Sequence, residues 1–343
     1  MNKIDIKSMT FEELEEVVRS LGQPKFRTGQ IFSWLQQGVS DFDEMSNIPA
    51  ELRRKLEEGY YIVTANVKKR LESRVDDTVK YLYEMHDGEL VESVVMKYNH
   101  GYSICISTQV GCRMGCSFCA SGLNGLVRNL SASEMLAQIT TAQRDLNIRI
   151  SNIVLMGMGE PLDNFDNVIR FLKLVSDERG LNVGMRHISL STSGVVPKIY
   201  KLMEYNFPIT LSISLHAPNN ETRSSIMKVN RSWNIAELIK ACRDYISVTK
   251  RRISFEYAVI DGVNNSNNDA KQLASLLKGM LCHVNLIPAN PVKENTYKKP
   301  DRQKIEHFCK TLNGLGINTT IRRTLGADID ASCGQLRGKE ISN

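Results

Sequence analysis

The stretch Cys112-Arg-Met-Gly-Cys116-Ser-Phe-Cys119 places three cysteines in one short loop, with the spacing C-x3-C-x2-C and no fourth cysteine nearby. A cubane iron–sulfur cluster is normally held by four thiolates, so three thiolates leave one iron open to another ligand. Structural zinc sites use four protein ligands and favour C-x2-C pairs, so a zinc knuckle or three unrelated thiols explain the spacing less well. We predict that Cys112, Cys116 and Cys119 hold one 4Fe–4S cluster per chain.

The segments around this loop alternate between strand-like and helix-like hydrophobic patterns. We expect strands at 102–108, 152–157, 186–191, 209–215, 253–260, 283–288 and 318–323. Helices are expected between them at 131–147, 165–178, 195–205, 234–248, 268–279 and 301–315. Repeated βα units predict a parallel sheet of the α/β class, and six units are too few for an eight-stranded barrel.

The cysteine spacing and the strand that precedes it resemble the radical S-adenosylmethionine (SAM) superfamily. The resemblance implies that residues 98–328 form a partial (βα)6 radical-SAM barrel. It also implies that the open iron binds the amino and carboxylate groups of SAM, and that an electron from the cluster cleaves SAM to a 5′-deoxyadenosyl radical. The site of a parallel barrel lies at the carboxyl ends of its strands.

Residues 1–60 are predicted to form a small helical domain, and 61–97 a β-hairpin-like connector. Thr10-Phe-Glu-Glu13 is a capping box, and Asp87-Gly88 is a hairpin turn. The second helical segment of this domain has candidate core positions, and basic residues occur throughout the domain. The candidate core positions are Phe26, Ile31, Trp34 and Leu35. The basic residues, which form either an RNA-contact surface or an ordinary solvated face, are Lys25, Arg27, Arg53, Arg54 and Lys55.

The composition is that of a globular protein, with 42% hydrophobic and 24% charged residues in 343. No apolar run approaches the length of a membrane span, and the start lacks the apolar core of a signal peptide. Eight scattered cysteines without a secretion signal indicate a reducing cytoplasm. A net charge of +6 is compatible with RNA as partner, and basic clusters occur at 68–70, 250–252, 298–299 and 322–323.

Two predicted strands end in sequences suited to ligand contact. Met156-Gly-Met-Gly-Glu-Pro161 contains glycines that let backbone approach a ligand, or it is only a turn. Gly159 and Glu160 resemble the superfamily's site for the SAM ammonium group. In Ser189-Leu-Ser-Thr-Ser-Gly194 the hydroxyls either cap the next helix or bind ligand, and the resemblance points to Ser191 as a SAM contact.

The fourth strand, Leu211-Ser-Ile-Ser-Leu-His-Ala-Pro218, carries polar residues where a buried parallel strand is ordinarily apolar. Such departures are expected at functional sites, so the end of this strand, with Ser214, Leu215 and His216, is a candidate SAM-binding segment. A lone histidine is otherwise more often structural. Asn290, at the end of the sixth strand, is a candidate hydrogen-bond partner of the SAM adenine or ribose.

Two further cysteines lie where they can react. Cys105 precedes the cluster loop in its strand, and Cys333 lies among small residues in Gly326-Ala-Asp-Ile-Asp-Ala-Ser-Cys-Gly-Gln-Leu336. A cysteine thiolate is a strong nucleophile, although a buried inert thiol is the alternative for both residues. The cysteines to which we assign that inert role are Cys242, Cys282 and Cys309.

Five motifs together resemble the RlmN family of RNA methyltransferases over nearly the whole chain. They are the cluster loop, Gly157-Met-Gly-Glu-Pro161, Ser191-Thr-Ser-Gly-Val-Val-Pro197, Ser214-Leu-His216 and the Asp328–Leu336 segment of a C-terminal tail at 329–343. The resemblance implies that adenosine becomes 2-methyladenosine in the peptidyl-transferase loop of 23S rRNA and in the anticodon loop of tRNA. It also implies a flavodoxin or ferredoxin as electron donor, and we expect a cytoplasmic monomer.

The resemblance assigns roles to three residues. Cys333 accepts a methyl group from one SAM, and a second SAM supplies the radical that activates it, so two SAM are consumed per methylation. Cys105 then releases the RNA through a transient disulfide with Cys333. Glu92 aligns with a glutamate assigned as proton acceptor, although Cys105 itself is an alternative acceptor.

Two alternatives remain open at this level. The Cfr group methylates carbon 8 of adenine and confers ribosomal antibiotic resistance; its members tend to have alanine and isoleucine where this chain has Pro161 and Ser193. A non-catalytic iron–sulfur RNA-binding protein would need the cluster and the basic surface but would not explain Cys105 and Cys333.

Overall fold

The structure, a computed structural model, describes residues 3–290 and 297–338. Its strands are β1 (Ile4–Asp5), β2 (Tyr60–Tyr61), β3 (Asn66–Glu72), β4 (Val79–Glu84), β5 (Leu90–Tyr98), β6 (Gly101–Cys105), β7 (Gln109–Gly111), β8 (Leu126–Asn129), β9 (Ile150–Leu155), β10 (Ile188–Thr192), β11 (Thr210–Ser214), β12 (Ile253–Val259), β13 (Cys282–Pro288) and β14 (Thr319–Ile321). Its α-helices are α1 (Phe11–Ser20), α2 (Phe26–Gln37), α3 (Ala50–Gly59), α4 (Ala132–Leu146), α5 (Phe165–Ser176), α6 (Val196–Glu204), α7 (Asn220–Ile226), α8 (Ile235–Thr249), α9 (Asn267–Leu277) and α10 (Arg302–Gly314).

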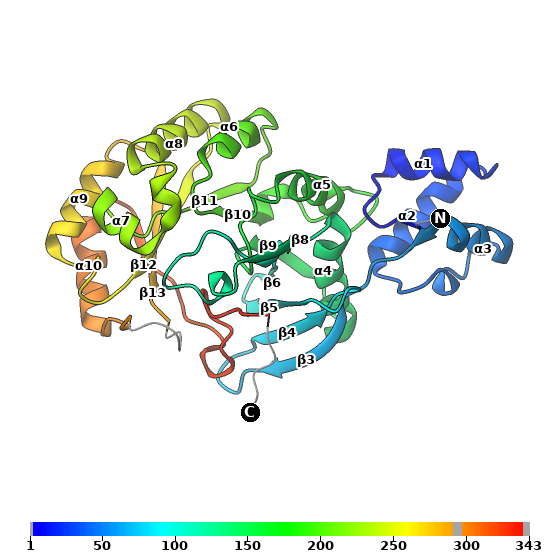
Figure 1. Cartoon of the computed structure of the whole chain (residues 1–343), viewed down its shortest axis with the longest axis horizontal. Coiled ribbons are helices and arrows are strands. Elements are labelled where there is room, and N and C mark those ends of the chain that lie inside the picture. Colours follow the sequence, from blue (N-terminus) through cyan, green and yellow to red (C-terminus); the bar gives the residue numbers. More distant parts are fainter. Residues whose placement is uncertain (1–2, 291–296, 339–343) are drawn as a thin grey trace.

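One curved sheet organises the described part of the chain, in the order β14-β13-β12-β11-β10-β9-β6-β5-β4-β3 (Figure 1). From β6 to β14 neighbouring strands are parallel, and Figure 1 shows α6, α8, α9 and α10 along the outer side of these strands. The predicted strands and helices from residue 102 onwards all form, with bounds that differ by only a few residues. The predicted α/β barrel architecture is therefore present, and α7 and the β7–β8 ribbon are additions to it.

The strands β3, β4 and β5 extend the same sheet in antiparallel fashion beyond β6. Gly88, with φ of +84°, turns the chain between β4 and β5 at the predicted hairpin. The strands β3–β5 of the predicted 61–97 connector thus share a sheet with the barrel strands. On one face of this extension the buried Tyr81 and Tyr83 pack toward α4, where the Tyr83 hydroxyl donates to the Gln138 carbonyl at 3.1 Å.

The helices α1, α2 and α3 form a lobe at one side of the molecule (Figure 1). The Thr10 hydroxyl accepts from the Glu13 N–H, and the Glu13 carboxylate accepts from the Thr10 N–H, as the capping box predicts. Ile31 and Leu35 are buried as expected, but the prediction for Phe26 was wrong, because its side chain is 60% exposed. No helix in the described residues is long and apolar enough to cross a membrane.

Candidate active site

The cluster loop lies between β7 and β8, which pair to form a short antiparallel ribbon. Gly111 ends β7 with φ of +75°, and an added Cβ would collide with the Gly125 carbonyl, so this turn requires glycine. The Cys112 N–H donates to the Gly125 carbonyl at 2.8 Å, and the Cys119 N–H donates to the Cys116 carbonyl at 3.1 Å. These bonds fold the loop so that all three thiols line one cavity.

The donor set of this loop fits a polynuclear cluster. Burial raises the pKa of the Cys112 thiol to about 12, and the nearby Glu160 and Cys119 charges add to the rise, so several thiolates here need a cation to stabilise them. Among the described residues no three Cys, His, Asp or Glu side chains converge as one metal ion requires. Cysteines around a cluster each bind a different iron, so they need not converge. The arrangement suits a cluster better than zinc.

The cavity lies at the carboxyl ends of the parallel strands, as expected for a parallel barrel. Three of the predicted residues, Leu215, Cys105 and Glu92, lie outside its lining. The other predicted residues line it together with the cluster cysteines: Gly159, Glu160, Ser191, Ser214, His216, Asn290 and Cys333.

Glu160 is buried, and its carboxylate joins two strand-end loops. One oxygen accepts from the Ser193 N–H at 2.7 Å, and the other accepts from the Leu162 N–H at 3.0 Å. Burial raises the pKa of this carboxyl, while the backbone donors oppose the rise. Each carboxylate oxygen has a second lone pair, so the group can still accept a bond from a ligand ammonium.

Ser191 and Ser214 come from neighbouring parallel strands, and their hydroxyl oxygens lie 3.4 Å apart at the cavity wall. Leu215 is different, because its side chain is fully buried in the hydrophobic core. Its N–H donates to the Glu256 carbonyl at 3.1 Å, and its carbonyl accepts from Arg223 Nε at 3.1 Å. Leu215 therefore shapes the strand end from within the core.

His216 has a left-handed backbone, with φ of +57°, and its Nδ1 accepts from the Ala258 N–H at 2.9 Å. Burial, reinforced by the charge of Arg223, lowers the pKa of His216 to about 3. The ring is therefore neutral with its proton on Nε2, and Nε2–H is the donor it offers. It also stands edge-on to Phe118 of the cluster loop, with the ring centroids 5.0 Å apart.

The tail places Cys333 in the cavity wall. The Ala120 N–H donates to the Gly334 carbonyl at 2.8 Å, and the Ser121 hydroxyl donates to the Leu336 carbonyl at 2.8 Å. The Asn290 side-chain amide, predicted to contact SAM, donates here to the Cys333 carbonyl at 3.1 Å. Three bonds from the cluster loop and the end of β13 thus hold Cys333 beside the cluster cysteines.

Arg322 lies beside both predicted reactive cysteines. Its Nη1 donates to Cys333 Sγ at 3.8 Å, and the charges of Cys333, Glu256 and Cys105 raise the pKa of the guanidinium. Cys105 ends β6 and is buried, whereas Cys333 is partly exposed. Both residues are free thiols. Burial raises the pKa of Cys105 to about 12; the Cys333 charge adds to this, and Arg322 opposes it.

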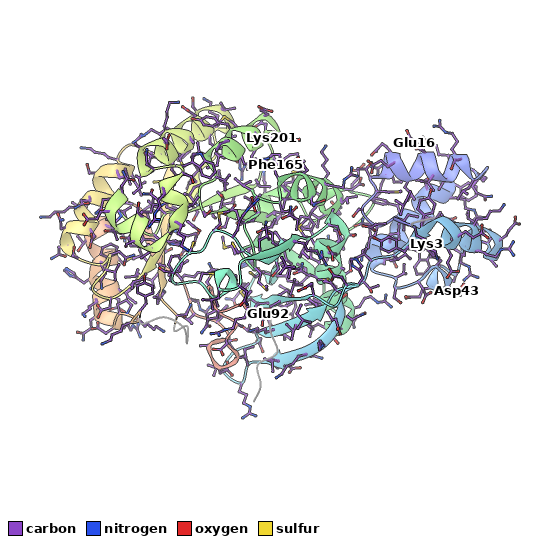
Figure 2. The ribbon with its side chains drawn as sticks, in the orientation of Figure 1. Lys3, Glu16, Asp43, Glu92, Phe165 and Lys201 are labelled. Atoms are coloured by element: carbon purple, nitrogen blue, oxygen red, sulfur yellow. The ribbon has the colours of Figure 1, made fainter. Side chains whose placement is uncertain are left out.

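Glu92 lies on β5 beneath the tail, and Figure 2 labels it beside that segment. Its Oε1 is 2.8 Å from Lys80 Nζ, and its Oε2 accepts from the Arg337 N–H at 2.6 Å. Both carboxylate oxygens are therefore engaged by the protein while the tail is in this position.

Two arginines of the site were not predicted from the sequence. Arg322 was predicted to belong to a surface cluster, but its side chain is only 25% exposed and lines the cavity. Its N–H donates to the Leu286 carbonyl, so the residue continues the pairing of β14 with β13. Arg223 on α7 is fully buried and donates to the carbonyls of Ser193 at 2.6 Å and Ser214 at 3.1 Å. A lone arginine in a short polar segment carries no signal of such burial.

Comparison with known proteins identifies the family. Residues 4–62 match the family described as "Ribosomal RNA large subunit methyltransferase N-terminal domain", and residues 106–275 match the "Radical SAM superfamily". The chain is 56% identical over 343 residues, all of both chains, to a protein of Alkaliphilus oremlandii described as "Probable dual-specificity RNA methyltransferase RlmN". The chain belongs to the RlmN family. A Clostridium novyi protein with the same RlmN description is 53% identical over 99% of both chains.

A solved structure agrees with this membership of the RlmN family. A radical SAM methyltransferase from Sphaerobacter thermophilus is 43% identical, superposes with a TM-score of 0.94, and covers 98% of this chain and 100% of its own. The predicted radical SAM fold is thus confirmed. As an RlmN-family member the protein is a radical SAM RNA methyltransferase, and the family implies a 4Fe–4S cluster and SAM.

Proposed function

We propose that this enzyme converts adenosine to 2-methyladenosine in 23S rRNA and in tRNA. The observation that supports the proposal is the position of Cys333, which shares one cavity with the three cluster cysteines and Arg322. Arg322 also interacts electrostatically with Cys105, so it lies near both reactive cysteines. Carbon 2 of adenine is electron-poor and has no nucleophilic lone pair, so it cannot displace a methyl group from SAM. A methyl group carried by a protein thiol and activated as a radical avoids this obstacle.

Cys333 acts first, as a thiolate that accepts the methyl group of one SAM while the Arg322 guanidinium stabilises its charge. The cluster, when bound, supplies the electron that cleaves a second SAM to a 5′-deoxyadenosyl radical. Cys333 then gives up one hydrogen atom of its S-methyl group, and the remaining methylene carbon adds to carbon 2 of adenine. RNA and Cys333 are now covalently joined, and two SAM have been consumed.

Cys105 completes the reaction by attacking the Cys333 sulfur, so that an S–S bond forms as the bond between that sulfur and the methylene carbon breaks. The electron pair of the broken bond stays with the methylene carbon, which takes up a proton and becomes the methyl group of the product. The adenine proton leaves to Glu92 or to Cys105. The overall balance also releases one electron, which a cluster held by Cys112, Cys116 and Cys119 would accept. We propose that flavodoxin or ferredoxin is the electron donor for SAM cleavage, and an external two-electron reductant then restores the two thiols.

The proposed RNA substrates agree with the net charge of +6 and with the helical lobe. There the Arg27 guanidinium lies 4.9 Å from the ring centroid of the exposed Phe26, a pairing of charge and aromatic surface that suits unstacked bases. A loop nucleotide is the cheapest to extrude into a buried site. We propose that the enzyme acts as a monomer in the cytoplasm.

The test is mass spectrometry of the cluster-reconstituted protein incubated with methyl-labelled SAM, a reductant and a ribosomal RNA fragment. Label on Cys333 followed by 2-methyladenosine in the RNA is the expected result. Formation of 8-methyladenosine would assign the Cfr reaction instead. An intact cluster with neither product would overturn the proposal in favour of RNA binding or another SAM reaction.

A further inference from the structure

A buried ion pair lies beneath the tail, away from the cavity lining. Lys80 Nζ on β4 and Glu92 Oε1 on β5 are 2.8 Å apart, and each side chain is only 3% exposed. In the antiparallel pairing Leu82 lies opposite Glu92, so Lys80 and Glu92 are diagonal neighbours on one face of the sheet.

The tail contacts both members of this pair, on the face of the sheet opposite Tyr81 and Tyr83. The opposite face of β4 carries Tyr81 and Tyr83 against α4, and an antiparallel sheet covered on one side ordinarily leaves its other face to water. Lys80 and Glu92 would then be ordinary solvated residues. The tail lies on that face instead, and both charges lose their water.

Each member of the pair holds a different end of the same loop. Lys80 Nζ donates to the Asp330 carbonyl at 3.0 Å. Glu92 Oε2 accepts from the N–H groups of Arg337 at 2.6 Å and Gly338 at 3.4 Å. Cys333 lies between these two attachments, so one ion pair fixes both ends of the loop that carries it.

We propose that Lys80 and Glu92 form a latch that positions the tail loop, residues 330–338, and with it Cys333. Lys80 is thus a positioning residue, and its effect on methyl transfer rests on the function proposed above. Removal of one partner leaves a buried unpaired charge, which is strongly unfavourable. Opening the tail returns that charge to water without disturbing the parallel strands. In such a variant the tail therefore opens more readily than the barrel unfolds.

A second attachment offers a matched control. Asp328 accepts from the Ser73 hydroxyl at 2.7 Å and from the Arg74 N–H at 2.8 Å, in an exposed position upstream of the tail loop. Because these bonds are exposed and lie outside residues 330–338, their loss should leave the loop around Cys333 closed.

The test is hydrogen exchange in the reconstituted full-length protein, read on peptides that cover 330–338. We expect Lys80→Met to speed exchange there at least tenfold, Asp328→Ala to change it less than threefold, and Lys80→Arg, which keeps charge and donors, to preserve most of the protection. The cluster absorption spectrum should be unchanged, whereas methyl loading of Cys333 should fall. Unchanged exchange in Lys80→Met would overturn the latch.

The charge-swapped variant, Lys80→Glu with Glu92→Lys, separates a latch from a simple ion pair. Glutamate at 80 cannot donate to the Asp330 carbonyl, and lysine at 92 cannot accept from Arg337, so the tail should remain open. Restored protection in the swap would overturn the proposal.

Faster exchange in β12 of Lys80→Met would mean that this substitution disturbs the barrel as well as the tail. Glu92→Gln then repeats the test, because glutamine has nearly the same shape as glutamate, and its effect on exchange must be confined to the tail. Exchange is independent of RNA product, so failure to form 2-methyladenosine would sink the proposed function alone.

Discussion

Arg322 donates from Nη1 to Cys333 Sγ at 3.8 Å, and the same guanidinium lies 3.9 Å from the Glu256 carboxylate. A guanidinium keeps its charge at every physiological pH, so Arg322 is a permanent cation beside the sulfur. The nearby Glu256 is itself buried and bound by the Asn285 amide at 2.8 Å, which fixes the direction of the arginine. The sulfur of Cys333 therefore has a fixed cationic partner.

Arg322→Met should slow methyl loading of Cys333 by about 10- to 100-fold at neutral pH, because a hydrogen bond to a charged group contributes about 1.5–3 kcal/mol. The measurement is the rate at which intact mass increases by one methyl group under single-turnover conditions. Arg323→Met is the control, since its side chain is exposed and should leave this rate within about twofold. Equal loss in both variants would contradict the assigned role.

Cys105→Ala should accumulate the covalent RNA adduct of Cys333 without releasing methylated RNA, because no thiolate remains to attack the sulfur. Gel mobility and mass spectrometry of the adduct measure this directly. Multiple turnover by the variant would rule out Cys105 as the resolving thiol.

The release step should also depend on pH in wild-type protein. Burial raises the pKa of Cys105 to about 12, so the neutral thiol dominates throughout the neutral range. Each unit of pH between about 7 and 9 should therefore multiply the thiolate fraction, and the rate of adduct decay, by about ten. Adduct decay that is flat with pH would show that another step limits release.

Gly159→Ala should abolish SAM binding, measured by equilibrium dialysis with labelled SAM. Gly159 has φ of +101°, and its new Cβ would lie 2.6 Å from the Gln109 Cβ and 2.8 Å from the Gln109 backbone nitrogen. Gly279→Ala is the matched control, because Gly279 also has positive φ, +72°, but no atom within 4 Å of an added Cβ. It should cost about 1 kcal/mol of stability and leave SAM binding intact. Similar SAM affinity in both variants would contradict the prediction that SAM binds against the backbone at Gly159.

Lys7→Met should stabilise the protein at pH 7. Lys7 is buried, with Nζ 3.3 Å from the Thr140 hydroxyl, and burial lowers its pKa to about 8. Below pH 8 the lysine is charged in both states, and the folded state bears the full desolvation cost. As pH rises from about 8 to about 10.5 the folded state gives up its proton first, so wild-type stability rises by up to about 3 kcal/mol.

Thermal melting of wild type and Lys7→Met across pH 7–9.5 measures this effect. The advantage of the variant should shrink as pH rises, since methionine removes only the cost of burying a charge. A gap that is constant with pH would mean that packing, and not ionisation, sets the difference.

The parts of the fold that sequence predicted depend on contacts between near neighbours. The capping box at Thr10 forms as expected, since it uses bonds to a residue three positions away. The same holds for the alternating βα units and for the cluster loop, whose three thiols share a cavity as their spacing predicts. Such signals need no knowledge of the tertiary structure.

The parts that sequence did not predict depend on distant segments. Lys80 reads as a polar residue of an alternating strand, and only a tail some 250 positions later buries it. Arg322 reads as half of a basic surface pair, and Phe26 reads as a core residue, yet the fold reverses both environments. In each case the local pattern is compatible with either outcome, and tertiary contacts decide.

The placement of Cys333 on a tail has a consequence for how the enzyme is assembled. Cys333 is synthesised more than two hundred residues after the cluster loop, whose cavity it helps to wall off. Domains begin to fold as the chain leaves the ribosome, so the barrel strands and the loop that carries Cys112, Cys116 and Cys119 can form while that wall is still missing. Iron and sulfide for the proposed cluster can therefore be delivered to an open site, which residues 330–338 cover once they have been synthesised.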